Sequence, residues 1–218
     1  IASVVLTLLI AAQPASYLER TAVALEQSRE DVPGLVEAAA EAAKRICAGG
    51  KLLAGGNPSL ISEMSGRAGG LMLTAGLGDQ VGAGDAVMFF ADAEHPFPPT
   101  LANSGAAIVL FGAKTDAEHV YGIPPRDEDF GISHTLCMAI QGWLFNAELV
   151  AACTHQRKMP VIFESIGLYG GVLRQQQYQG HGIFFHEKCE VPEIAPGALS
   201  GEYIKRVSAM LRRCLKEH

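Results

Sequence analysis

A glycine-rich turn after a short apolar run is the first place where residue types and spacing suggest chemistry. Lys51 to Ala54 is predicted to form a buried strand, and Gly55-Gly56-Asn57-Pro58-Ser59 follows it directly. Asn is a favoured N-cap and Pro is favoured at the first helical position, so a helix is predicted to begin at Pro58. The first N–H groups of a helix lack internal partners and bind anions or hydroxyl oxygens. The turn therefore predicts a ligand site, although glycines in such turns are also found where close packing alone requires them.

Two further residues lie on predicted helices. Glu63 lies on the helix that begins at Pro58, and His134 lies near the start of a long apolar helix predicted over residues 132–156. The simplest interpretation of both is structural, because Glu63 and Arg67 have the i,i+4 spacing of a helical ion pair. His134 near a helix start can also serve only to hydrogen-bond the backbone.

These residues resemble the opening of sugar isomerase (SIS) domains, and among them the phosphoheptose isomerases. The resemblance rests on Ala48 to Ser59 and on Glu63-Met64-Ser65-Gly66-Arg67, and it covers roughly residues 17–161. It implies a five-stranded parallel sheet between helices, assembled as a homodimer or tetramer. It also implies aldose–ketose isomerisation, with Glu63 and His134 as catalytic residues, because a partly buried carboxylate and an imidazole are typical general acid and base groups near neutral pH. The ligand-binding residues that it implies are Gly55, Gly56, Asn57, Ser59, Ser62 and Arg67.

A second loop departs from the SIS pattern. The relatives carry a loop rich in Ser and Thr that holds phosphate, whereas Ala91 to Pro99 contains Asp92, Glu94 and His95 and no hydroxyl. Carboxylates beside a phosphate repel it unless they are paired. The expected ligand is a sugar or sugar phosphate, with a neutral sugar as a reasonable substitute.

Two function classes therefore remain, a sugar isomerase and a non-catalytic sugar-binding, sensing or structural module. A nucleotide-binding Rossmann-like enzyme fits less well, because the glycine turn lacks G-x-G-x-x-G and no P-loop lysine follows it. No cofactor is expected.

The elements that must position these residues alternate along the chain. Continuous apolar runs are typical of parallel strands buried on both faces, and alternation with helices favours right-handed crossovers. The predicted fold is an α/β three-layer sandwich of the flavodoxin-like or Rossmann-like kind, formed by residues 16–164, with residues 165–218 as a C-terminal extension packed on it. Helices are predicted over 17–30, 31–47, 58–67, 132–156 and 202–217, and strands over 51–54, 71–73, 86–90, 106–111, 119–125 and 159–163.

Composition excludes some partners and leaves others open. The net charge of −6 and the lack of a basic stripe argue against nucleic-acid binding. Five scattered cysteines without a C-x-x-C pair are expected to be buried small hydrophobes. The cluster at His181, His186, Glu187, Cys189 and Glu190 lacks zinc spacing, so a surface strand is expected there and no metal.

The first residues form an apolar segment. Ile1 to Ala12 resembles the apolar part of a secretory signal, and small residues follow it. Residues 1–15 are therefore expected to be either a signal remnant, which favours export, or an ordinary first helix of a cytoplasmic protein. No other segment is expected to be long and apolar enough to span a membrane.

Overall fold

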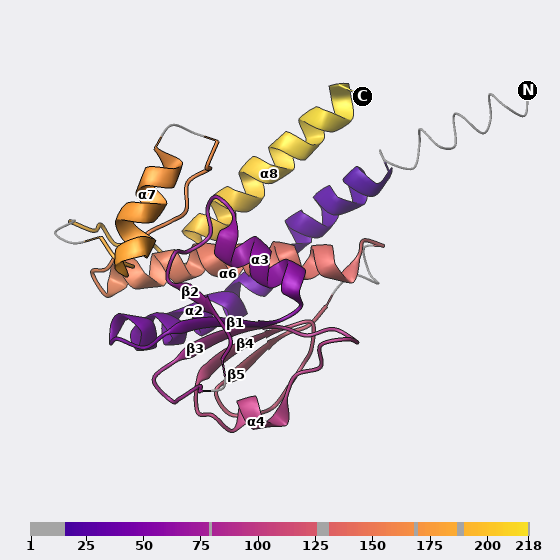
Figure 1. The fold of residues 1–218 in the computed structure, drawn as a ribbon. Coiled ribbons are helices and arrows are strands. Elements are labelled where there is room, and N and C mark those ends of the chain that lie inside the picture. Colours follow the sequence, from indigo (N-terminus) through magenta and orange to yellow (C-terminus); the bar gives the residue numbers. More distant parts are fainter. Residues whose placement is uncertain (1–15, 79, 126–130, 168–169, 187–189, 218) are drawn as a thin grey trace, which may run out of the picture.

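The sheet of this computed structural model, which describes residues 16–78, 80–125, 131–167, 170–186 and 190–217, contains five parallel strands (Figure 1). The strand order is β2-β1-β3-β4-β5, which is the flavodoxin-like order. The predicted α/β class with a five-stranded parallel sheet between helices is thus confirmed. The strands are β1 Leu52–Gly56, β2 Thr74–Gly76, β3 Ala86–Phe90, β4 Ala107–Phe111 and β5 Val120–Ile123.

Helices cover the two faces of the sheet unequally. Helices α2, α3 and α6 lie on one face, and the single turn α4 lies on the other with the loops around it (Figure 1). The α8 helix packs on α6, on the side away from the sheet. Residues 16–27 are helical, and the other helices are η1 Ser28–Asp31, α2 Val32–Cys47, α3 Pro58–Gly66, α4 Pro99–Ala102, α6 His134–His155, α7 Gly171–Tyr178, η2 Gln179–His181 and α8 Ala198–Glu217.

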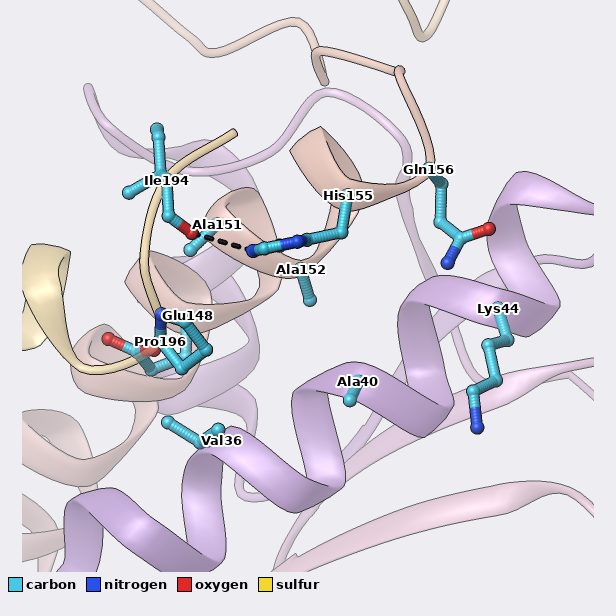
Figure 2. Close-up of a pocket in the computed structure, with 10 residues that line it drawn as sticks. All are labelled: Val36, Ala40, Lys44, Glu148, Ala151, Ala152, His155, Gln156, Ile194 and Pro196. Carbon is cyan, nitrogen blue, oxygen red and sulfur yellow. Dashed lines mark hydrogen bonds between the residues drawn. The ribbon is translucent and has the colours of Figure 1, made fainter. Parts of the chain in front are cut away.

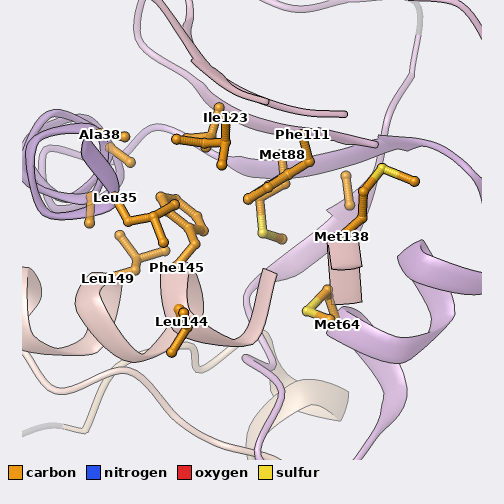
Figure 3. Packing of buried hydrophobic residues seen from close by; sticks show 14 of the residues in the cluster. Leu35, Ala38, Met64, Met88, Phe111, Ile123, Met138, Leu144, Phe145 and Leu149 are labelled. Atoms are coloured by element: carbon orange, nitrogen blue, oxygen red, sulfur yellow. The ribbon is translucent and has the colours of Figure 1, made fainter. Parts of the chain in front are cut away.

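The main core lies between the sheet and α6. Phe111 of β4 stacks on Phe90 of β3, with ring centroids 4.7 Å apart, and meets the edge of Phe145 of α6 at 6.0 Å. Figure 3 shows Phe145 with Leu149 facing Leu35 of α2 below the strands. Successive strand residues alternate between the two faces of the sheet. The strand side chains on the face away from α6, such as Leu53, therefore form a second core with α4.

Two predicted strands are wrong in position. The residues predicted over 71–73 precede β2, and Leu71 instead forms an isolated antiparallel bridge with Ile162. The run over 159–163 does not join the five-stranded sheet, because Pro160 bridges Phe185. These two runs pair with each other and bury a separate small cluster of Met72, Val161 and Phe163. Apolar runs this short indicate burial without indicating the partner.

The expectation that no segment after the first residues is long and apolar enough to span a membrane is wrong for α6. Within the described ranges it is the one helix long and apolar enough to cross a membrane by length and composition. However, 72% of its most apolar stretch is buried inside the protein, so packing on both of its sides accounts for its composition. The signal-like residues 1–15 lie outside the described residues.

The C-terminal extension is fastened to α6 by a buried carboxylate. Glu148 is 1% exposed, and its two oxygens accept the N–H groups of Gly197 and Ser200 at the start of α8, at 2.8 and 3.0 Å. The His155 Nε2–H donates to the Ile194 carbonyl at 2.8 Å, as Figure 2 shows. Helix α8 begins at Ala198, earlier than predicted, because this carboxylate caps its first turn. Helix α7 has no counterpart among the predicted helices.

Candidate functional site

A crevice at the carboxyl ends of β1 and β3 is the candidate site. The strand order reverses between these two strands, which is where α/β sheets bind ligands. Three segments meet there, namely the turn after β1, the loop after β3 and the start of α6. The crevice has a volume of about 560 Å³ and is lined by Asn57, Asp92, Ala93, Glu94, His134 and Thr135.

Asn57 joins the two strand ends. Its Oδ1 accepts the N–H groups of Ser59 and Leu60 at 3.0 and 3.3 Å, which confirms the predicted N-cap and the helix start at Pro58. Its Nδ2 donates to Asp92 Oδ2 at 2.7 Å. The Ile61 N–H donates to the Asn57 carbonyl, and Pro58 has no N–H. The donors of this first turn are therefore already paired, and an anion finds none of them free.

The two glycines before Asn57 are explained by packing of the strands. Gly56 has φ +88°, and a Cβ there would lie 2.1 Å from the Phe90 carbonyl oxygen. A Cβ at Gly55 would lie 2.7 Å from the Leu77 side chain. The steric interpretation of these glycines thus has direct support, and their contact with a ligand stays a prediction.

Asp92 is the most strongly hydrogen-bonded group of the crevice. Its Oδ1 accepts the N–H groups of Glu94 and His95 at 2.9 and 2.7 Å, and the His95 ring nitrogen lies 2.9 Å away. The hydrogen bond from Asn57, followed by those from His95, lowers the pKa of Asp92 to about 2. Among the described residues Asp92 Oδ2 accepts the Asn57 hydrogen bond alone, so it can accept a second one from a ligand hydroxyl.

His134 begins α6 above the end of β3. Ser133 is the N-cap, and its Oγ accepts the Leu136 N–H at 3.2 Å. The His134 Nε2 lies 3.3 Å from the Ala91 carbonyl oxygen. Gly112, at φ +88°, leaves room for this arrangement, because a Cβ there would lie 3.1 Å from His134 Nε2. The sequence predicted His134, but it gave no reason to single out Gly112.

Glu63 lies in a different cavity. Its Oε2 pairs with Arg67 at 3.1 Å, and its Oε1 accepts the Trp143 Nε1–H at 3.3 Å. The simpler interpretation of Glu63 and Arg67 as an i,i+4 ion pair is therefore confirmed. This cavity has a volume of about 520 Å³ and lies between α3, α6 and α8, with Asn146 and Tyr203 in its wall. Burial and then the charge of Glu63 raise the pKa of Tyr203.

The two predicted catalytic residues do not meet within one chain. His134 lines the crevice, whereas Glu63 is held by Trp143, which lies ~13 Å further along the α6 axis at 1.5 Å per residue. Aldose–ketose isomerisation moves a proton between neighbouring carbons, so the pair acts on one sugar only if a second copy brings them together. Ser59 and Ser62 are exposed on α3 and line neither cavity.

A third cavity is smaller and more apolar. It lies between α2, α6 and the segment before α8, with a volume of about 180 Å³ (Figure 2). This is below the usual 300–1,000 Å³ of ligand sites. Two of the polar groups that line it, Glu148 and His155, already bond to the backbone of the C-terminal segment.

No metal centre emerges from the part of the chain that the structure describes. No group of three His, Cys, Asp or Glu residues there is arranged to hold an ion. His186 instead lies beside Arg174 and the Tyr178 ring of α7, and burial followed by the Arg174 charge lowers its pKa. Glu187 and Cys189 lie outside the described residues.

Comparison with known proteins assigns the chain to no family. No protein-family model matches the chain, and no curated protein matches it. The resemblance to SIS domains therefore stays a prediction from the motif residues alone.

Proposed function

We propose that this protein binds a sugar or sugar derivative through its hydroxyl groups in the crevice between β1 and β3. The observation that supports this most is the convergence of Asn57, Asp92 and His134 from three separate segments at the switch point of the sheet. The volume of about 560 Å³ is in the range of small-molecule sites.

The polar groups of the crevice favour hydroxyls over phosphate. Asp92 and Glu94 are both acidic, and among the described residues that line the crevice there is no Lys or Arg. Asp92 Oδ2 can accept a hydroxyl hydrogen, while the Thr135 hydroxyl can donate or accept. Sugar hydroxyls do both, whereas a phosphate would bring negative charge beside an ionised Asp92.

Binding without isomerisation is favoured over catalysis. Glu63 is held by Arg67 and Trp143 in the cavity between α3, α6 and α8, away from His134. An isomerase would need a homodimer or tetramer in which Glu63 of one copy faces the crevice of another. Isomerase activity is therefore the second candidate, and it requires an assembly that completes the pair.

Isothermal titration calorimetry on the full chain tests the proposal. The ligands are neutral aldoses, ketoses, amino sugars and the matching sugar phosphates, each titrated at the same pH. We expect heat from at least one non-phosphorylated sugar and weaker binding of its phosphate. The His134→Gln variant should lower that affinity at least tenfold, because it removes the imidazole from the crevice. His155→Gln is the matched control, since His155 lies in the small cavity at the other end of α6.

Two results would overturn the proposal. One is the absence of binding by every sugar to folded protein. The other is binding that His134→Gln leaves intact but Trp143→Ala abolishes, which would move the ligand to the cavity of Glu63 and Asn146. That cavity is a specific rival, because Asn146 Oδ1 is buried there without a hydrogen-bond partner among the described residues.

A further inference from the structure

Cys47 and Cys153 form a pair of thiols at the opposite end of α6 from the crevice. Cys47 is the last residue of α2, and Cys153 lies in the last turns of α6. The two helices pack on each other, and Lys158 bonds to the main-chain oxygens of both cysteines, so the two residues are neighbours. Cys153 is fully buried, whereas Cys47 is only partly covered. A reagent in solution therefore reaches one member of the pair first.

Lys158 fixes both cysteines in place. Its N–H donates to the Cys153 carbonyl at 3.0 Å, and its Nζ donates to the Cys47 carbonyl at 2.6 Å. The ammonium group also lies 5.2 Å from the centre of the Phe185 ring. One residue thus ties the end of α2 to the end of α6, and its positive charge is near enough to favour the thiolate form of both cysteines.

The surroundings give the two thiols different roles. The hydrogen bond from Cys153 and the charge of Lys158 lower the pKa of Cys47. The same hydrogen bond, followed by burial, raises the pKa of Cys153. Since the thiolate is the nucleophile, Cys47 is the thiol that reacts first with an incoming reagent. Cys153 is the thiol that reacts in the second step.

We propose that Cys47 and Cys153 are a dithiol site that low-molecular-weight disulfides convert into an internal disulfide. The Cys47 thiolate attacks one sulfur of the small disulfide, forms a mixed disulfide and releases one small thiolate, which takes up a proton. Cys153 then loses its proton, and its sulfur attacks the Cys47 sulfur and expels the second small thiolate. Two protein thiols are oxidised to one disulfide, and one small disulfide is reduced to two thiols. The product links α2 to α6, and the step is independent of sugar binding.

Intact-mass spectrometry after treatment of the reduced full chain with oxidised glutathione tests the proposal. We expect wild type to lose two hydrogens and peptide mapping to link Cys47 with Cys153. The melting temperature should rise on the order of 10–20 °C on oxidation, because the link closes a loop of about 100 residues. Cys153→Ser should stop at a single glutathione adduct on Cys47, and Cys47→Ser should form neither adduct nor link at Cys153. Cys214→Ser, on α8, is the matched control and should behave as wild type.

Three results would overturn the proposal. These are wild type that keeps both thiols, wild type that accumulates the stable glutathione adduct without the link, and a disulfide that joins other cysteines. Lys158→Gln supplies an independent readout, because it should slow alkylation of Cys47 several-fold at pH 7 and shift the pH profile of that rate upward. An unchanged profile would contradict the role given to Lys158.

Discussion

The Glu148→Gln substitution removes the charge from the buried carboxylate that holds the start of α8. In the native protein both of its oxygens accept backbone N–H groups, from Gly197 at 2.8 Å and from Ser200 at 3.0 Å. Gln keeps one acceptor and turns an NH₂ group toward the other N–H. A hydrogen bond to a charged group contributes ~1.5–3 kcal/mol. A negative charge at a helix N-terminus adds up to ~2 kcal/mol. Burying the charged Glu side chain costs free energy that the neutral Gln avoids, and this saving offsets part of the two losses.

The net expectation is a loss of about 3 kcal/mol in the free energy of unfolding. For a chain of this size, ~2–4 °C of melting temperature corresponds to each kcal/mol, so the melting temperature should fall by ~6–12 °C at pH 7. Differential scanning calorimetry measures this fall, and amide hydrogen exchange should show faster exchange in the first turn of α8. Glu202→Gln, which alters a solvent-exposed ion pair with Arg206 on the same helix, is the matched control and should leave the melting temperature unchanged. A Glu148→Gln protein that melts with wild type would refute the capping role.

Two further substitutions test the strand ends. Asp92 has its pKa lowered from 3.8 to about 2, so its stabilisation is present above pH 3.8 and lost as the pH falls toward 2. Asp92→Asn should therefore flatten the acid limb of a stability–pH curve by ~1 kcal/mol, after allowance for solvent screening, and an unaltered limb would contradict this. Gly56→Ala should lower the free energy of unfolding by ~3 kcal/mol or more in urea, because its Cβ would collide with the Phe90 carbonyl. A loss below ~1 kcal/mol would argue against the steric role.

The sequence predicted best those features that depend on neighbouring residues. The start of α3 followed from Asn57 and Pro58, since an N-cap and its helix are adjacent in the chain. The parallel sheet followed from the continuous apolar runs of β3 and β4. By contrast, β2 was misplaced because Leu71 has apolar neighbours yet pairs with Ile162, far along the chain.

The site was harder to predict, because its contacts join distant segments. In the sequence Asp92 indicates only that a phosphate would be repelled, and nothing local shows that it bonds to Asn57 across two strand ends. Glu63 and His134 were linked by a resemblance, but chain spacing does not reveal that Trp143 holds Glu63 in another cavity. Helix α7 was missed because its glutamines and flanking glycines show no strong apolar period.

The place of α6 in the chain has a consequence for synthesis on the ribosome. All five strands precede residue 134, so the whole sheet can leave the ribosome before the helix that covers Phe90 and Phe111. Until α6 emerges, that part of the main core faces water, and exposed apolar surface makes nascent chains prone to aggregation. A chain that stops before α6 will therefore need chaperone protection or precipitate, although it contains every strand of the sheet.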